Sequence, residues 1–235
     1  FAGAGCFLLT LRHCMLSYER MIKRRVIASR RPDTTRRRIL EGAGRLFAAE
    51  GYHAVGFRDM AQAAGVSLRM PHHYFGSKRK LFAECVRYAL VDRINLAALF
   101  TEPPPAGDRR RAKAAVARSI RTCFHAIHPR SGRPSWSGDL IGRALTENLD
   151  ESLAALQDGL KPARDWFYPA LRILRPDMNP QAYVLWYVSL WAQISFYVTA
   201  RPAILARLGR KNYSRAFLET AADHLVHVML KQLED

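Results

Sequence analysis

The 235-residue sequence predicts an all-α fold, with a small helical domain near the amino terminus and a larger helical body behind it. From Thr34 onward, apolar side chains recur at the three- and four-residue spacing of one helix face. Serine, threonine or glycine stands at most of the predicted helix ends, where these residues cap or terminate helices. No stretch alternates apolar and polar residues between turn dipeptides, and we therefore predict no strand.

Residues 1–31 are predicted to be a basic, flexible extension that belongs to neither domain. Their apolar run comes before the positive charges, whereas a secretory signal places its positive charges first. The run is also too short to span a bilayer. Its basic residues either form an arm that binds DNA or are a solvated tail; they are Lys23, Arg24, Arg25, Arg30 and Arg31.

Residues 32–80 are predicted to form a three-helix domain. Its first helix starts at Thr34 or Thr35 and ends at Gly51, because glycine suits the left-handed residue after a helix. The second helix runs from about Phe57 to Ala64 and is closed by the next glycine. The first helix carries one apolar face, made of Ile39, Leu40, Ala43, Leu46 and Phe47.

The third helix is predicted from about Leu68 to Phe75, between Ser67 as its N-cap and Gly76 as its stop. Pro71 then falls at the fourth helical position. One early hydrogen bond is lost there, and the cost stays below the ~3 kcal/mol of a proline deep inside a helix. Ser77 caps a longer fourth helix, with which the domain of residues 81–235 begins.

The body is predicted to be entirely helical. A proline-rich segment, Glu102 to Asp108, interrupts the periodicity and is the best hinge along the chain. Pro162 and Pro169 are expected to kink or divide the helix in which they lie. The helices predicted after the hinge cover about 109–128, 136–148, 150–174, 180–200 and 212–233.

The segment from Tyr183 to Val198 is apolar on almost every side, so it is either buried all round or embedded in lipid. It is barely long enough to cross a membrane, and its tryptophans lie inside the run rather than at its ends. A helix shared between two subunits fits this pattern better, with the last helix as a second contact face. The residues predicted at this homodimer interface are Tyr183, Trp186, Leu190, Phe217, Ala221, Leu225 and Val228.

The net charge of +17 is concentrated toward the amino terminus. Residues 1–80 hold 16 basic and 5 acidic side chains, a net +11, against +6 for residues 81–235. This asymmetry favours a surface that binds a polyanion over a generally solvated basic surface. The four cysteines have no metal-like spacing, and we predict no metal, no cofactor and a cytoplasmic protein.

A helix, a tight glycine turn and a second helix form the helix-turn-helix arrangement, which places its second helix in the major groove of DNA. Arg69 is the best candidate for a bidentate contact to guanine, and Lys78 for a phosphate at the start of the next helix. A helical hairpin with a wet basic surface is the alternative. The predicted DNA-binding residues are Ser67, Arg69, Met70, His72, His73, Tyr74 and Lys78.

The segment Arg36 to Val86 resembles the DNA-binding domain of the TetR (TetR/AcrR) family of bacterial transcriptional regulators. Matching features include "EGY" at residues 50–52, "AGVS" at 64–67, "YF" at 74–75 and "SK" at 77–78. The resemblance implies a homodimer that binds a palindromic operator in double-stranded DNA. Further on, "WAQISFYVTARPAILARLGRKNYS" and "ETAADHLVHVML" resemble the carboxy-terminal domain of the CecR-like branch.

The same resemblance implies a repressor that a small-molecule effector releases from DNA, with the effector bound in the helical body. Large aromatic and polar side chains are the candidates for that cavity, although each aromatic is also suited to ordinary core packing. The predicted pocket residues are Arg143, Trp166, Phe167, Tyr187, Trp191, Gln193 and Phe196.

Two other functions stay open from the sequence. The first, an enzyme, is a remote alternative, because the sequence contains no Ser-His-Asp order, phosphate-binding glycine loop or metal-spaced cluster. We therefore predict no catalytic residue. The second is a relative that has lost DNA binding and acts as a ligand-binding dimer. Pro71 in the presumed recognition helix motivates that alternative.

Overall fold

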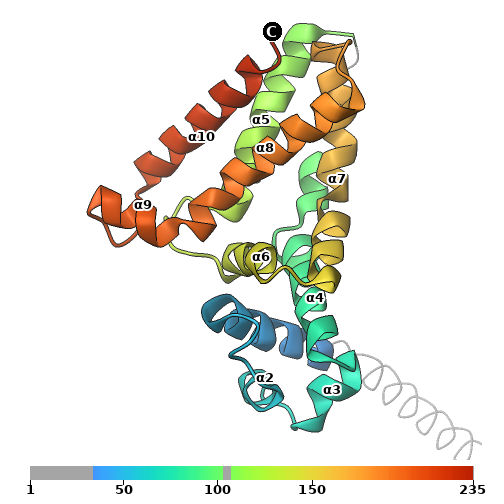
Figure 1. Ribbon diagram of the computed structural model, residues 1–235, viewed down its shortest axis with the longest axis vertical. Coiled ribbons are helices and arrows are strands. Elements are labelled where there is room, and N and C mark those ends of the chain that lie inside the picture. Colours follow the sequence, from blue (N-terminus) through green and yellow to red (C-terminus); the bar gives the residue numbers. More distant parts are fainter. Residues whose placement is uncertain (1–33, 103–106, 235) are drawn as a thin grey trace, which may run out of the picture.

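The computed structural model describes residues 34–102 and 107–234, so the predicted extension of residues 1–31 lies outside the described residues. The all-α prediction is confirmed: the described part of the chain contains helices and turns but no strand. The small domain lies at the bottom of Figure 1, and the helical body stands above it. Within the described ranges, no helix is both long and apolar enough to cross a membrane.

The small domain consists of a first helix (residues 34–50), α2 (Phe57–Ala64) and α3 (Arg69–Phe75). Ile39 and Phe47 of the first helix are fully buried, as is Met60 of α2. Phe47 meets Phe82 edge-on, with 5.0 Å between the ring centroids. The apolar face predicted for the first helix is therefore the face that builds this core.

The turn between α2 and α3 depends on a close approach to the first helix. Gly65 adopts φ +60°, and the N–H of Val66 bonds to the carbonyl of Ala61 at 3.0 Å, which closes α2. A Cβ at Gly42 of the first helix would lie 2.9 Å from the backbone nitrogen of Ala64. Arg38 donates from Nη2 to the carbonyl oxygen of Gly65 at 2.6 Å and fixes the turn.

The predicted cap of α3 was wrong by one position. Leu68, not Ser67, is the N-cap, and no side chain caps the helix, because leucine has no acceptor. The backbone carbonyl of Ser67 accepts the N–H of Met70 at 3.0 Å. Pro71 is therefore the third helical residue, whose N–H would have no partner within the helix in any case. No helical hydrogen bond is lost at Pro71, and its ring is buried against the domain core.

α4 (Lys78–Tyr88) links the two domains. Ser77 caps it as predicted, accepting from the N–H of Lys80 at 3.2 Å. The helix continues as a π-helical turn (Ala89–Arg93) and is followed by a 3-10 helix (Leu96–Phe100). α4 packs along α7 and rises from the small domain into the body (Figure 1).

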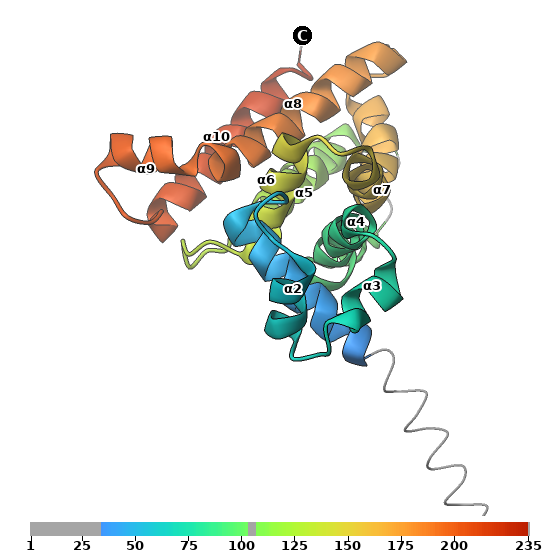
Figure 2. The same ribbon diagram turned by 60° about the horizontal axis from the view of Figure 1, so that its bottom comes forward.

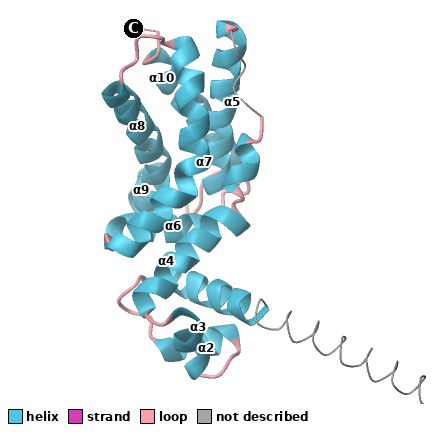
Figure 3. Cartoon of the chain, turned by 90° about the vertical axis from the view of Figure 1, so that its right-hand side faces the viewer, coloured by secondary structure: helices cyan, strands magenta, loops and turns pink. Residues whose placement is uncertain are grey.

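After α4, the described residues of the body form five longer α-helices and one short one. α8 and α10 pack against each other, and α6 lies between the small domain and the rest of the body (Figures 1 and 3). Residues 103–106 of the predicted hinge lie outside the described residues. The short helix α9 was not predicted. The bounds are α5 Arg109–Ile127, α6 Trp136–Glu147, α7 Asp150–Leu174, α8 Pro180–Thr199, α9 Arg201–Leu208 and α10 Arg215–Lys231.

α7 runs through both prolines as one helix, so of the two predicted effects, a kink or a division, the division does not occur. Each proline frees the carbonyl four residues earlier, and those carbonyls belong to the exposed residues Asp158 and Asp165, where water can bind them. The opposite side of α7 carries Phe167 and Leu171, both fully buried. Burial of this face outweighs the local cost of the prolines.

The orientation of α8 also corrects a prediction. Tyr183, Trp186 and Leu190 are buried in the core of their own chain, and the Trp186 indole donates to the carbonyl of Met229 at 2.9 Å. On α10, Ala221 and Leu225 are likewise buried, whereas Phe217 and Val228 are half-buried. The apolar face that α8 leaves to solvent consists of Val184, Leu185, Val188 and Phe196, which are 54–63% exposed.

Candidate nucleic-acid interface and effector cavity

α3 has one face in the domain core and one face in solvent. Pro71 and Phe75, four residues apart, are buried, whereas Arg69, His72 and His73 are exposed. Seen from below, α2 and α3 lie together at the end of the molecule away from the body (Figure 2). The exposed side chains of α3 can therefore reach a DNA groove without unfolding the helix, and they are donors suited to bases and phosphates.

Two other residues of α3 that were predicted to bind DNA are partly buried. Met70 and Tyr74 are half-buried against the core, and Tyr74 lies beside His73 with 5.7 Å between ring centroids. Ser67 is exposed. Sequence reasoning missed Leu68, an apolar side chain that is 58% exposed at the start of α3 and is suited to contact a thymine methyl group.

The side chain of Lys78 contacts residues of its own domain. Its Nζ donates to the carbonyl oxygen of His53 at 3.3 Å and lies 4.5 Å from the centroid of the Tyr52 ring. Burial lowers the pKa of Lys78, and the charge of Glu147 opposes that effect. Its phosphate contact stays a prediction, and the observed contacts hold the turn after the first helix.

Sequence reasoning also missed the role of Arg38 in holding the turn of the helix-turn-helix. The signal was present, because Arg38 and Gly42 are four residues apart and therefore share one face of the first helix. That face is the one against which the α2–α3 turn packs.

Two side chains of α6 hold the small domain. Arg143 donates to the carbonyl oxygens of Ala48 at 3.4 Å and Ala49 at 3.2 Å, at the carboxy-terminal end of the first helix. Glu147 accepts from the N–H of Tyr52 at 2.9 Å. Arg143 does not line the apolar cavity, and its role in effector binding stays a prediction.

An apolar cavity of about 260 Å³ lies in the body beside α6. Of the predicted pocket residues, Trp191 alone lines it, and its indole nitrogen is buried without a hydrogen-bond partner among the described residues. Gln157 and Ser195 add polar atoms to an otherwise aliphatic wall. That wall includes Leu90, Ile127, Ile141, Leu145, Leu153, Leu156, Leu160 and Val198.

The other predicted pocket residues do not line this cavity. Phe196 is 60% exposed on the outer face of α8, and Phe167 is fully buried in the core. Tyr187 donates to the carbonyl of Leu160 at 3.1 Å, and Gln193 to the Met229 sulfur at 3.3 Å. The sequence could not distinguish residues that line a cavity from residues of the packed core, because both are apolar side chains at helical spacing.

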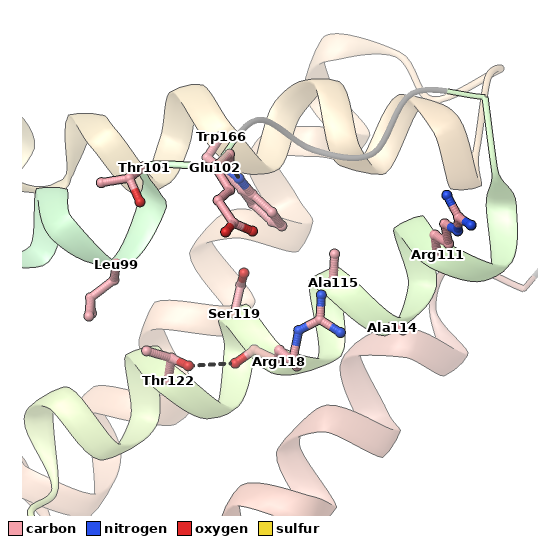
Figure 4. Close-up of a pocket in the computed structure, with 10 residues that line it drawn as sticks. All are labelled: Leu99, Thr101, Glu102, Arg111, Ala114, Ala115, Arg118, Ser119, Thr122 and Trp166. Carbon is pink, nitrogen blue, oxygen red and sulfur yellow. Dashed lines mark hydrogen bonds between the residues drawn. The ribbon is translucent and has the colours of Figure 1, made fainter.

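Trp166 of α7 lines a different hollow, of about 430 Å³, together with residues of α5 and of the segment 99–102. Its indole donates to the carbonyl of Glu102 at 2.6 Å. Figure 4 shows Glu102, Ser119 and Trp166 around the same space, with Arg118 alongside. This hollow is polar, whereas the cavity beside α6 is apolar, so the two suit different ligands.

The fold and the exposed face of α3 define a class of protein, one with an amino-terminal helix-turn-helix domain on a larger α-helical body. Residues 39–85 match the family model described as bacterial regulatory proteins, tetR family. The small domain is therefore similar to the amino-terminal domain of that family. A curated relative, the HTH-type transcriptional repressor AcnR of Corynebacterium glutamicum, is 40% identical over 62 residues, which are 26% of this chain and 33% of that repressor.

Solved structures extend the likeness to the body. A TetR-like transcriptional regulator from Rhodococcus sp. RHA1 superposes with a TM-score of 0.59 at 16% identity, covering 85% of this chain and 96% of that one. The regulator AibR, solved in complex with isovaleryl coenzyme A and operator DNA, gives 0.56 at 15% identity, covering 83% and 97%. At 15–16% sequence identity, these matches show a shared fold and nothing further. The names that these matches carry are those of transcription regulators, not of enzymes.

Proposed function

We propose that the protein is a DNA-binding transcriptional repressor, which binds a palindromic operator as a homodimer and is released by a small-molecule effector. The observation that carries this proposal is α3, a helix anchored by Pro71 and Phe75 that turns Arg69, His72 and His73 to solvent. The cationic amino-terminal region supplies the sequence-independent attraction to phosphate.

The homodimer is proposed to form through the exposed apolar face of α8. Val184, Leu185, Val188 and Phe196 lie on one side of this helix, and each leaves more than half of its side chain exposed. Such a stripe is costly in a monomer but supplies the apolar centre of a subunit interface. Two copies joined in this way would present two α3 helices to the two halves of a palindrome.

The effector is proposed to occupy the apolar cavity, because one helix borders both the cavity and the small domain. Ile141 and Leu145 of α6 line the cavity, while Arg143 and Glu147 of the same helix hold the end of the first helix. A ligand that shifts α6 would therefore move the small domain. An acyl group suits the aliphatic wall, and the isovaleryl coenzyme A complex of AibR supports this class. Membership in the CecR-like branch is part of the same proposal.

A mobility-shift assay of the purified chain against its own upstream DNA tests the regulator. We expect a salt-dependent shift, and Arg69→Ala should reduce discrimination at one base pair per half-site by ~1–3 kcal/mol. Arg207→Ala, at an exposed site on α9, is the matched control. A folded dimer that shifts no DNA even at low salt would instead favour the ligand-binding dimer without DNA binding.

A further inference from the structure

A hollow of about 370 Å³, lined by both charged and apolar residues, lies between the small domain and the body, next to the apolar cavity. Three elements line it: Ala48 from the first helix, residues of α6, and the junction of α8 with α9. Its polar and charged lining consists of Asp139, Arg143, Thr146, Thr199 and Arg201.

Arg201 is the unusual member of this lining. Its side chain is 13% exposed, and Nε and Nη1 are buried without any hydrogen-bond partner among the described residues. Nη2 lies 3.8 Å from Oδ1 of Asp139, which is an ion-pair distance but too long for a hydrogen bond. The guanidinium carbon also lies 5.4 Å from the centroid of the Tyr213 ring, a cation–π contact that stabilises the charge but leaves Nε and Nη1 without an acceptor. Buried donors without an acceptor are unfavourable.

The local charge favours an anion as that acceptor. Arg143 supplies a second guanidinium, and Asp139 is the single carboxylate in the lining. Burial raises the pKa of Asp139, while Arg201 and Arg143 act to lower it. With Asp139 ionised, the two guanidinium groups give the lining residues a net charge of +1.

We propose that this hollow binds a compact oxyanion, a carboxylate or a phosphate, with Arg201 as the main donor and Arg143 as the second. The planar guanidinium fork matches two oxygens of either group. The oxyanion has two possible sources, a free small ion or the anionic end of the effector. The second source rests on the proposed function, and it is considered because Gly142 and Val198 line both this hollow and the apolar cavity.

Occupancy of this site would affect the contact between the domains. Arg143 holds the neutral carbonyls of Ala48 and Ala49 with bonds of 3.4 and 3.2 Å. A charged acceptor forms shorter and stronger bonds to a guanidinium than a carbonyl does. A bound oxyanion therefore competes with the first helix for Arg143, and loosens the small domain from α6.

Calorimetric titration of the full chain at constant ionic strength tests the site, with sodium phosphate, sodium octanoate and uncharged 1-octanol as probes. In Arg201→Gln, the affinity for the bound oxyanion should fall about tenfold or more, because a charge-assisted hydrogen bond is lost. Arg207→Gln, on the exposed side of the same helix, is the matched control and should bind like the wild type.

The probes separate the sources. Phosphate binding that depends on Arg201 assigns a free ion, whereas octanoate binding that depends on Arg201, without phosphate binding, assigns the anionic end of an aliphatic effector. The proposal is overturned if the binding of neither oxyanion depends on Arg201. Octanol that binds as tightly as octanoate excludes the anionic end of an effector as the source. Should Arg201→Gln fail to fold, Arg143→Gln replaces it, and an unchanged affinity there overturns the proposal. DNA plays no part in these titrations, so they do not depend on whether the protein is a regulator.

Discussion

Glu147 of α6 accepts a hydrogen bond from the backbone N–H of Tyr52 at 2.9 Å, so a helix of the body holds the turn that follows the first helix of the small domain. Lys78 of α4 reaches the same turn through the carbonyl of His53 at 3.3 Å. The turn is thus held from two sides, by the helix that borders the apolar cavity and by the helix that links the domains.

Removing the first of these contacts should loosen the turn without unfolding the protein. In Glu147→Ala, we expect the amides of residues 51–53 to exchange about tenfold faster, because a hydrogen bond worth about 1–2 kcal/mol is lost. Hydrogen–deuterium exchange measures this directly. Asp92→Ala, at an exposed carboxylate on the π-helical turn, should leave these amides unchanged. Unaltered protection in Glu147→Ala would mean that the contact does not hold the turn.

Gly65 in the α2–α3 turn can be compared with Gly209, which ends α9 with the same backbone conformation. Gly65 and Gly209 both have φ +60°, so alanine costs about 1–2 kcal/mol at either position from backbone strain alone. At Gly65 a Cβ would also lie 2.7 Å from Nη2 of Arg38, whereas at Gly209 it would meet no atom within 4 Å. Denaturant unfolding should therefore show the larger loss for Gly65→Ala, by roughly 1 kcal/mol. Equal losses would show that Arg38 moves aside freely.

The sequence predicted most of the helices correctly because their ends and periodicity are local properties. Gly65, Gly76 and Ser77 each stand where the structure ends or begins a helix. The short α9 was missed because it is too short to show a clear periodicity. The bounds of α7 were predicted, but the sequence could not decide the effect of its prolines, because burial in the tertiary structure rather than local propensity determines it.

The solvent-facing residues of α3 could be predicted from the sequence, whereas the outward face of α8 and the contacts of Arg143 could not. The reason is again that periodicity is a local property. Arg69 and His73 could be assigned to a solvent face because a helix-turn-helix leaves only one face of its second helix free. On α8 nearly every residue is apolar, so periodicity could not tell Trp186, which packs inside, from Leu185, which points outward. The polar contact between Arg143 and Ala49 joins residues far apart in sequence, and no local pattern marks it.

The outward face of α8 predicts the oligomeric state and a way to disrupt it. Leu185 is 63% exposed, the largest fraction among the exposed apolar residues, and Leu185→Glu would place a charge in the proposed interface. We expect a wild-type dimer by sedimentation velocity and a monomer for Leu185→Glu at micromolar concentration. Leu208→Glu, at a 36% exposed leucine on α9, is the control and should stay dimeric. A monomeric wild type would contradict the proposed interface.

His128 predicts how the stability of the body depends on pH. Its ring is 1% exposed, with Nε2 at 2.8 Å from the carbonyl oxygen of Ile194, and burial lowers its pKa from 6.5 to about 4. Because the pKa is lower in the folded than in the unfolded state, the unfolded chain binds the extra proton as the pH falls below 6.5. The folded state should then lose about 2 kcal/mol between pH 7 and pH 5 through this one group.

The His128→Phe variant isolates this effect from the other titrating groups. Phenylalanine fills a similar volume but leaves the Ile194 carbonyl without its donor, so the variant should be less stable at pH 7 by about 1 kcal/mol. It cannot bind the proton, however, and its stability should fall less than that of the wild type on acidification. Urea unfolding of both proteins at pH 7 and pH 5 gives the two differences. If the two proteins lose the same stability between these pH values, His128 is not kept neutral by burial in the folded chain.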